Sequence, residues 1–411
     1  MKVLIYSLNY APELTGVGKY SGELADWLSE HNHEVRVVAS PPYYPDWSVD
    51  DGYNPWAYKK EQDSLSLVMR CPLWVPKSPN GIKRILHLIS FAVTSFPIML
   101  AWSFWKADVV IVIEPPLFCS PAALMSGFLG NSKTILHVQD FEVDAAFDLG
   151  LVKGVWLKNF IQWGEQWLYR HFDRVTTISS NMLLLLGKKG VSESNRFLFP
   201  NWVNTQRIFP TNTKSSFRAD LCIDSNKIVA LYSGNMGEKQ GLDIIIDAAS
   251  LLKSNSEIVF VMCGSGAAYN RLKEIGIELT NIYWLPLQPI ERLNELLNIA
   301  DIHLLPQRKD VADLVMPSKL TGMLASGKPV LATAESDTEI WEMVKECGIT
   351  TVSSGDTSSF AEAIVSLASD RELRSRLGAA ARKYAEKYLD QEIVLSNFEQ
   401  ELISLLKKEN T

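Results

Sequence analysis

Residues 3–38, VLIYSLNYAPELTGVGKYSGELADWLSEHNHEVRVV, decide the fold. They predict an apolar strand over 3–6, a loop that contains Gly16 and Gly18, a helix, and a second strand over 34–38. This order makes a βαβ unit, which implies a parallel sheet that binds ligands at the carboxyl ends of its strands. The loop lacks the spacing and the third glycine of a dinucleotide fingerprint, so turn chemistry alone explains its glycines at least as well as a ligand does.

The length and composition are those of a globular protein with two domains. The chain has 411 residues, 47% hydrophobic and 21% charged, and its net charge of −7 argues against a partner that is a nucleic acid. Five scattered cysteines, none in CxxC spacing, indicate reduced thiols in a cytosolic protein and no zinc site. A polar stretch after Asn204 predicts domains over 1–204 and 205–389, with a terminal helix over about 390–411 packing back on the first.

An acidic loop follows the strand predicted over 134–138. The sequence QDFEVD, residues 139–144, places Asp140, Glu142 and Asp144 within five residues. At the carboxyl end of a parallel strand these carboxylates could orient an acceptor hydroxyl or a sugar. The alternative is that some of them only cap a helix, because acidic residues favour a first turn. We expect a functional role above all for Asp140.

Residues 64–107 contain no Asp or Glu and include a long apolar segment. Ile85 to Trp105 is long and apolar enough for a membrane-spanning helix, but it contains His87 and Pro97 and connects two strands of one sheet. We therefore expect one or two helices that partly enter a membrane surface. Lys83 and Arg84 would meet anionic headgroups, and Trp102 and Trp105 would lie at the interface. The alternative is a helix that is simply buried against the sheet.

The second half of the chain repeats the order of strand, small-residue loop and helix. The strand over 228–232 leads into SGNMGEKQG, residues 233–241, where glycines permit close approach to an anion and Lys239 could reach a phosphate. The strand over 258–262 is followed by Gly264. The stretch DLVMPSKLTGMLASGKPVLA, residues 313–332, offers Ser318 and Lys319 at a turn, where we expect a nucleotide diphosphate. An ordinary strand–helix–strand unit with a solvated lysine is the alternative.

These motifs together resemble the family 4 retaining glycosyltransferases of the GT-B fold, over almost the whole chain. The resemblance rests on the following segments: NYAPELTGVGKYSGELADWL, PPLFCSPAAL, HVQDFEVDAAFDLGL, RVTTIS, FPNWV, YSGNMGEKQGL and VMPSKLTGMLASGKPVLATA. They are most similar to the bacterial branch that includes the colanic-acid glycosyltransferases and the O-antigen N-acetylfucosaminyl transferases. The resemblance implies an α/β protein with two Rossmann-like, doubly wound domains that face a cleft.

The resemblance also implies an activity. A hexosyltransferase of this kind moves a sugar, here fucose or N-acetylfucosamine, from a GDP- or UDP-linked donor to a polyprenyl-diphosphate-linked acceptor in exopolysaccharide or O-antigen synthesis. It needs no metal and no cofactor, and it works in the cytoplasm at the inner face of the bacterial plasma membrane. Two alternatives stay open: a nucleotide-sugar epimerase of the same fold, and a non-catalytic subunit of a polysaccharide assembly complex.

Site residues are implied by matching positions. The donor site would include Gly16 and Gly18 in the first domain, the loop from Gly234 to Lys239 with Asn235, Gly264, Ser318 and Lys319, backbone amides near Val315, and Glu339. Lys239 and Lys319 would neutralise the leaving diphosphate, and Gln139 or Asp140 would hold the sugar or the acceptor.

The sequence departs from the family pattern at three places. The usual pair of glutamates eight apart falls on Leu314 and Gly322, so ribose contacts must come from elsewhere, for example from Asp313. The usual His-Asp is Gln139-Asp140, and the arginine that accompanies the phosphate lysine is replaced by Asn235 or Glu238. We therefore expect Lys319 to supply the second positive charge.

Overall fold

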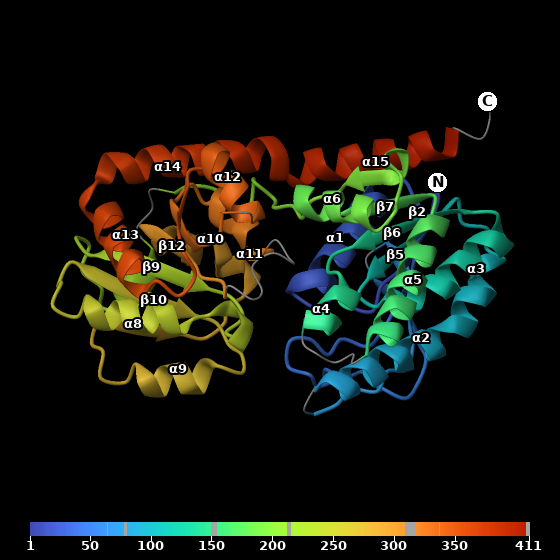
Figure 1. The fold of residues 1–411 in the computed structure, drawn as a ribbon, viewed down its shortest axis with the longest axis horizontal. Helices are drawn as coiled ribbons and strands as arrows, with labels where there is room; N and C mark the ends of the chain where they lie inside the picture. Colours follow the sequence, from blue (N-terminus) through green and yellow to red (C-terminus); the bar gives the residue numbers. More distant parts are fainter. Residues whose placement is uncertain are drawn as a thin grey trace. The chain divides into compact units, whose positions relative to one another are not determined.

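The computed structural model describes residues 1–63, 65–77, 80–148, 154–211, 215–308, 317–336 and 338–407. The chain forms two compact units. Unit 1 comprises Met1–Pro200 and Leu395–Thr411, and unit 2 comprises Asn201–Val394. Each unit is an α/β structure built on its own sheet (Figure 1).

The described strands of unit 1 form an eight-stranded sheet in the order β3-β4-β2-β1-β5-β6-β7-β8. Every described pair is parallel except β3 with β4. The central strands β1 and β5 are almost wholly buried, which explains their continuous apolar sequences. The bounds are β1 (Lys2–Tyr6), β2 (Glu34–Ala39), β3 (Lys59–Asp63), β4 (Ser66–Arg70), β5 (Val109–Glu114), β6 (Lys133–Val138), β7 (Arg174–Thr177) and β8 (Arg196–Leu198).

Helices connect these strands in the manner of a doubly wound sheet. They are α1 (Gly16–Glu30), α2 (Gly81–Ser103), α3 (Ser120–Gly130), α4 (Glu142–Asp148), α5 (Val155–His171) and α6 (Ser180–Lys188). Helices α2, α3 and α5 lie side by side along one side of the sheet (Figure 1). The βαβ unit expected over the first residues is β1, α1 and β2, with β1 and β2 paired in parallel.

The apolar segment after Lys83 is one helix, α2, which runs through Pro97 without ending. One side of it packs into unit 1: Phe91 and Met99 are buried, and the Tyr6 and Ser95 hydroxyls are 2.5 Å apart. Burial lowers the pKa of His87 to about 4, so its ring is neutral, and Nδ1 lies 2.7 Å from Trp74 O. Among the described helices α2 alone is long and apolar enough to cross a membrane, yet it is a connection within the sheet.

The described strands of unit 2 form a six-stranded, parallel sheet in the order β11-β10-β9-β12-β13-β14. The strands are β9 (Ile228–Ser233), β10 (Ile258–Cys263), β11 (Ile282–Leu285), β12 (Ile302–Leu305), β13 (Val330–Thr333) and β14 (Ile349–Val352). The helices are α7 (Ser216–Asp220), α8 (Asp243–Leu251), α9 (Tyr269–Ile275), α10 (Leu293–Ile299), α11 (Lys319–Ala325), α12 (Glu339–Cys347), α13 (Thr357–Ser369) and α14 (Arg371–Tyr384). Apolar side chains of β9, β10 and β12 form its core with α8 and α13.

The last helix, α15 (Gln391–Lys407), belongs mostly to unit 1. Its Phe398 ring stacks on Phe199 with centroids 3.9 Å apart. Its Glu399 carboxylate lies 2.7 Å from His33 Nε2. Residues that follow unit 2 in the chain therefore complete the packing of unit 1.

Candidate active site

Two loops at the carboxyl ends of β9 and β10 lie backbone to backbone. A Cβ on Gly264 would lie 1.9 Å from the carbonyl oxygen of Gly234, and both residues have positive φ, +149° and +136°. The loops are tied by hydrogen bonds from Gly234 N to Cys263 O (3.0 Å) and from Met236 N to Ser265 O (2.7 Å). The Tyr232 hydroxyl donates to Asn235 O at 2.6 Å. Only glycine allows this approach, so Gly234 and Gly264, both expected at the donor site, shape the same patch of backbone.

Lys319, the first residue of α11, directs its side chain to this patch. Its Nζ lies 4.1 Å from the centroid of the Tyr232 ring, and a Cβ on Gly234 would lie 3.4 Å from its Cδ. The ammonium is buried, and it has no hydrogen-bond partner among the residues that the structure describes. Burial lowers the pKa of Lys319 to about 7. A buried cation in this condition is stabilised by an anion.

The other donor-site residues named from the sequence are distributed around these loops. Lys239 lies in a 3₁₀ turn, Glu238–Gln240, that follows Gly237. Ser318 precedes α11, and its carbonyl accepts the Thr321 hydroxyl at 2.9 Å. Glu339 begins α12, behind the capping Thr338. Asp313, Leu314 and Val315 lie outside the described residues.

Arginines missed in the sequence analysis border the same loops. Arg271 of α9 pairs with Glu238 (3.0 Å) and with Asp243 (2.5 Å). The carboxylate of Glu238, one of the two residues that could stand in place of the expected arginine, is therefore neutralised. Arg308 helps to line a cavity of about 310 Å³ at the carboxyl ends of β12, β13 and β14, with Gly241, Gln307 and Thr333. Arg271 and Arg308 lie on elements other than the loop after β9 that they border, so the spacing of residues in the sequence could not connect them with it.

In unit 1 the side chains of the acidic loop after β6 are held by neighbouring residues of the fold. Glu142 accepts the Leu117 N–H at 2.9 Å, and burial raises its pKa. Asp144 pairs with Lys189 at 2.8 Å. Gln139 donates its amide to His137 Nε2 (2.9 Å), and the neutral His137 ring bonds Thr176 Oγ1 through Nδ1 (2.8 Å). Asp140 lies half-buried between these braced residues.

A buried polar network, missed from the sequence, anchors this loop. The Tyr169 hydroxyl lies 3.0 Å from Glu114 Oε2 and 3.4 Å from Glu165 Oε1. Lys189 Nζ bonds Glu165 Oε2 at 2.7 Å and also holds Asp144. Burial raises the pKa of Glu114 and of Glu165. The network joins β5, α5 and the residue after α6 to α4, so it positions the loop that carries Asp140.

Replacing Lys189 with methionine should destabilise unit 1 by about 3–5 kcal/mol, because it leaves two carboxylates without their cation. Loss of the cation raises the pKa of Glu165 further above its unfolded value. The deficit in unfolding free energy should therefore be smaller at pH 5 and larger at pH 8, where the Glu165 carboxyl group is ionised in the unfolded chain. Urea denaturation followed by tryptophan fluorescence measures it, because most tryptophans lie in unit 1.

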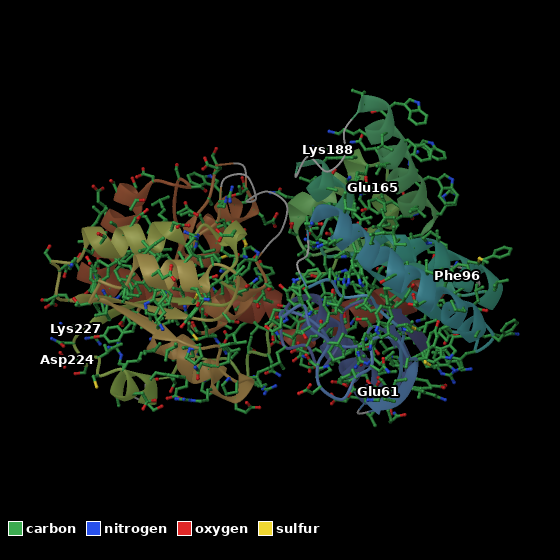
Figure 2. All side chains as sticks on the ribbon, turned by 90° about the horizontal axis from the view of Figure 1, so that it is seen from below. Glu61, Phe96, Glu165, Lys188, Asp224 and Lys227 are labelled. Carbon is green, nitrogen blue, oxygen red and sulfur yellow. The ribbon has the colours of Figure 1, made fainter. Side chains whose placement is uncertain are left out.

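The control is Lys188→Met, at the exposed neighbouring position (Figure 2). It should change the unfolding free energy by less than about 0.5 kcal/mol. Equal effects of the two substitutions would contradict the assignment of Lys189 to the network.

Gly16 and Gly18, expected in the first loop, lie instead in the first turn of α1, where Gly18 packs on the Glu13 carboxylate. A Cβ on Gly18 would lie 2.5 Å from Glu13 Oε2, and Gly16 has a φ of +59°. Glu13 is buried, which raises its pKa to about 7. Its Oε1 accepts the N–H groups of Tyr43 and Tyr44, both at 3.1 Å. Glu13 therefore joins the loop after β1 to the loop after β2, and Gly18 makes room for it.

The residues expected at a membrane lie at opposite ends of α2. Lys83 and Arg84 are exposed in its first turn. Trp105 packs against Arg36, whose Cζ lies 4.2 Å from its ring centroid, and its Nε1 bonds Glu34 Oε1 at 3.2 Å. Arg36 also lies 5.5 Å from the Trp102 ring. Both tryptophan rings thus pack against Arg36 of β2.

Metal ligands do not gather within the described part of the chain. No group of three or more His, Cys, Asp or Glu side chains there is arranged to hold a metal ion.

Comparison with known proteins shows the family. Residues 15–202 match the family described as "Glycosyl transferase 4-like domain", and residues 213–384 match "Glycosyl transferases group 1". The chain is 41% identical over 406 residues to WcaI of Escherichia coli (strain K12), a protein assigned as a colanic acid biosynthesis glycosyl transferase. That alignment covers 97% of this chain and 98% of the relative.

Solved structures show the same fold at low identity. Sucrose-phosphate synthase from Thermosynechococcus elongatus has a TM-score of 0.74 at 14% identity, covering 99% of both chains. HepE of Anabaena, in complex with UDP, has a TM-score of 0.71 at 12% identity, covering 98% of this chain and 100% of that one. The GT-B architecture expected from the sequence is confirmed. The chain belongs to the group 1 glycosyltransferases, with a glycosyl transferase 4-like domain in its N-terminal half.

Proposed function

We propose that unit 2 binds the diphosphate of a nucleotide sugar between the Gly234 and Gly264 loops and Lys319. The observation that carries this proposal is the buried Lys319 ammonium, which lacks a hydrogen-bond partner among the described residues and lies beside glycine backbone. A diphosphate placed there would supply the missing counter-charge. UDP is bound by HepE, a structural neighbour, which supports a nucleotide as the ligand.

Transfer then depends on the charge that develops on the leaving nucleotide. Lys319, and Lys239 from the neighbouring turn, would stabilise that charge without a metal. We propose a retaining reaction in which the leaving phosphate assists the acceptor hydroxyl on the same face of the sugar, with Gln139 and Asp140 holding sugar or acceptor. Donor contacts would also come from Asn235, Ser318, the amide near Val315, and Glu339. Gly16 and Gly18 would shape the start of α1 in unit 1.

One relative supports a class of product. WcaI is assigned to colanic acid biosynthesis, which supports an exopolysaccharide product here. We propose a GDP- or UDP-linked donor carrying fucose or N-acetylfucosamine, and a polyprenyl-diphosphate-linked acceptor. For such an acceptor we propose that the protein works in the cytoplasm, peripherally on the inner face of the plasma membrane, with Glu142 and Asp144 in the acceptor loop.

The test is incubation of the protein with a panel of nucleotide sugars and a lipid extract. Release of nucleoside diphosphate together with a lipid product of one added sugar is the expected result. Isomerised nucleotide sugar without release would indicate an epimerase instead. If no nucleotide sugar binds in calorimetry, the protein is a non-catalytic subunit.

Proton uptake should accompany binding of the nucleotide sugar. The Lys319 pKa of about 7 rises when the diphosphate arrives, so affinity is highest below pH 7 and falls as pH rises above it. A nucleotide sugar has no phosphate group that titrates near neutrality, so the proton taken up from the buffer is bound by the protein. Calorimetry at pH 8 in two buffers of different ionisation enthalpy should show uptake approaching one proton per site.

The matched variant is Lys319→Arg, which stays charged and should bind without proton uptake. Uptake that is unchanged in this variant would show that another group titrates.

A further inference from the structure

Helix α5 turns a stripe of aromatic rings toward solvent. Trp156, Phe160, Trp163 and Trp167 are 81%, 57%, 62% and 47% exposed. Their spacing places them on one side of the helix, while Glu165 and Tyr169 on the other side are buried. Figure 2 shows ring side chains projecting outward from the helix that carries Glu165. The rings of neighbours in the stripe stack on each other at 6.1 Å.

The two helices beside α5 also have apolar outer faces. Val93 of α2 and Phe104 at its end are 65% and 85% exposed, and Phe128 of α3 is 87% exposed. Helix α3 contacts both α2 and α5, so the three outer faces form one surface. We call this surface, made by α2, α3 and α5, the three-helix face. Contiguous exposed apolar area of this kind marks an interaction site rather than ordinary surface.

The charges on the three-helix face have one sign. Helices α2 and α3 contain no acidic residue, and the acidic residue of α5, Glu165, is buried and bonded to Lys189. The exposed charges are Lys83, Arg84 and Arg170. Aromatic rings with flanking cations and no exposed carboxylate match a layer of anionic headgroups above acyl chains. A protein partner would require no such uniform sign.

We propose that unit 1 docks on an anionic lipid bilayer through the three-helix face. The Trp156, Phe160 and Trp163 rings enter the headgroup–acyl boundary, and Lys83 and Arg84 contact anionic headgroups. The outer side of α2 then lies against the membrane surface. Trp102 and Trp105 stay packed on Arg36. The inference rests on the proposed function because a lipid-linked acceptor requires the protein at a membrane.

The first test is co-sedimentation with vesicles of phosphatidylglycerol and phosphatidylcholine. The wild-type protein should bind, and the triple variant W156Q/F160Q/W163Q should bind at least about tenfold more weakly. The control is I275Q/I277Q, which removes two exposed apolar side chains of unit 2 and should bind like the wild type. Thermal unfolding shows that each variant is folded. Equal binding by the triple variant, or no binding by the wild type, would overturn the proposal.

The second test distinguishes a lipid bilayer from other partners of the three-helix face. K83E/R84E should weaken binding to the anionic vesicles and leave the weaker binding to pure phosphatidylcholine vesicles unchanged. Analytical ultracentrifugation without lipid should show a monomer; a dimer that the triple variant abolishes would assign the face to a second copy and overturn the proposal. Nucleotide-sugar binding without lipid should be the same in the triple variant and the wild type, so failure at the membrane and failure of the donor site are distinguishable.

Discussion

Lys319→Met should lower kcat/KM for sugar transfer by a factor of about 10²–10³. Methionine fills a similar volume, so the loops around Gly234 stay in place while the charge that faces them is removed. Removal of one preorganised charge at the leaving group typically costs this much, because the charge acts in the transition state. Steady-state kinetics on the donor identified by the nucleotide-sugar panel measures the change.

The same substitution should make the folded protein more stable. The pKa of Lys319 is about 7 when folded and 10.5 in its ordinary state, so between these values the unfolded chain binds the extra proton. Stability of the wild type therefore rises with pH from about 7 to about 10.5, and below pH 7 the buried ammonium costs its full penalty. Methionine removes that penalty, so the gain in unfolding free energy should be largest below pH 7.

The control is Lys328→Met, at a half-buried lysine whose pKa is also lowered by burial. Lys328 lies just before β13, at the amino ends of the parallel strands, whereas the Gly234 loop lies at their carboxyl ends. This variant should keep wild-type kcat/KM. Turnover by Lys319→Met at the wild-type rate would remove Lys319 from the donor site.

Gly264→Ala should cost about 3 kcal/mol or more of unfolding free energy in unit 2 and abolish tight donor binding. The new Cβ would meet the Gly234 carbonyl oxygen at 1.9 Å, and the φ of +149° is already unfavourable for alanine. The atoms that the new Cβ would meet all belong to the Gly234 backbone, so relief requires the two loops to separate. Separation moves Gly234 away from Lys319 and opens the patch that would hold the diphosphate.

Gly355→Ala separates backbone strain from collision. Gly355 has a φ of +84° but no atom within 4 Å of a Cβ position. Its substitution should cost about 1 kcal/mol, from strain alone. Chemical denaturation measures both variants, and a loss at Gly264 no larger than at Gly355 would show that the loops separate at little cost.

The fold could be predicted from the sequence because each strand and glycine loop is a local pattern. Residues 3–38 specify a βαβ unit by themselves, and residues 228–241 specify a strand and the glycine loop that follows it. Parallel order follows from the helices between strands. Gly234, Gly264 and Lys319 were identified for the same reason: they lie immediately after strands or in the turn before a helix. The structure brings these three together.

The residues that were missed depend on three-dimensional partners. Glu13 is buried because Tyr43 and Tyr44 reach it from a distant loop, and Lys189 finds Asp144 and Glu165 only after α5 and α6 have packed. The aromatic rings of α5 show most clearly what sequence spacing fails to predict. Spacing of three and four residues normally predicts the buried side of a helix, but here the side that carries Glu165 and Tyr169 is buried instead.

The division of α15 between the units has a consequence for synthesis on the ribosome. Unit 2 is one continuous stretch, Asn201–Val394, whereas unit 1 lacks Phe398 and Glu399 until the end of translation. Although the N-terminal half emerges first, we expect unit 2 to finish folding before unit 1 acquires its last packing partner. An expression truncation that ends at Pro200 would thus expose Phe199 and deprive His33 Nε2 of its Glu399 partner.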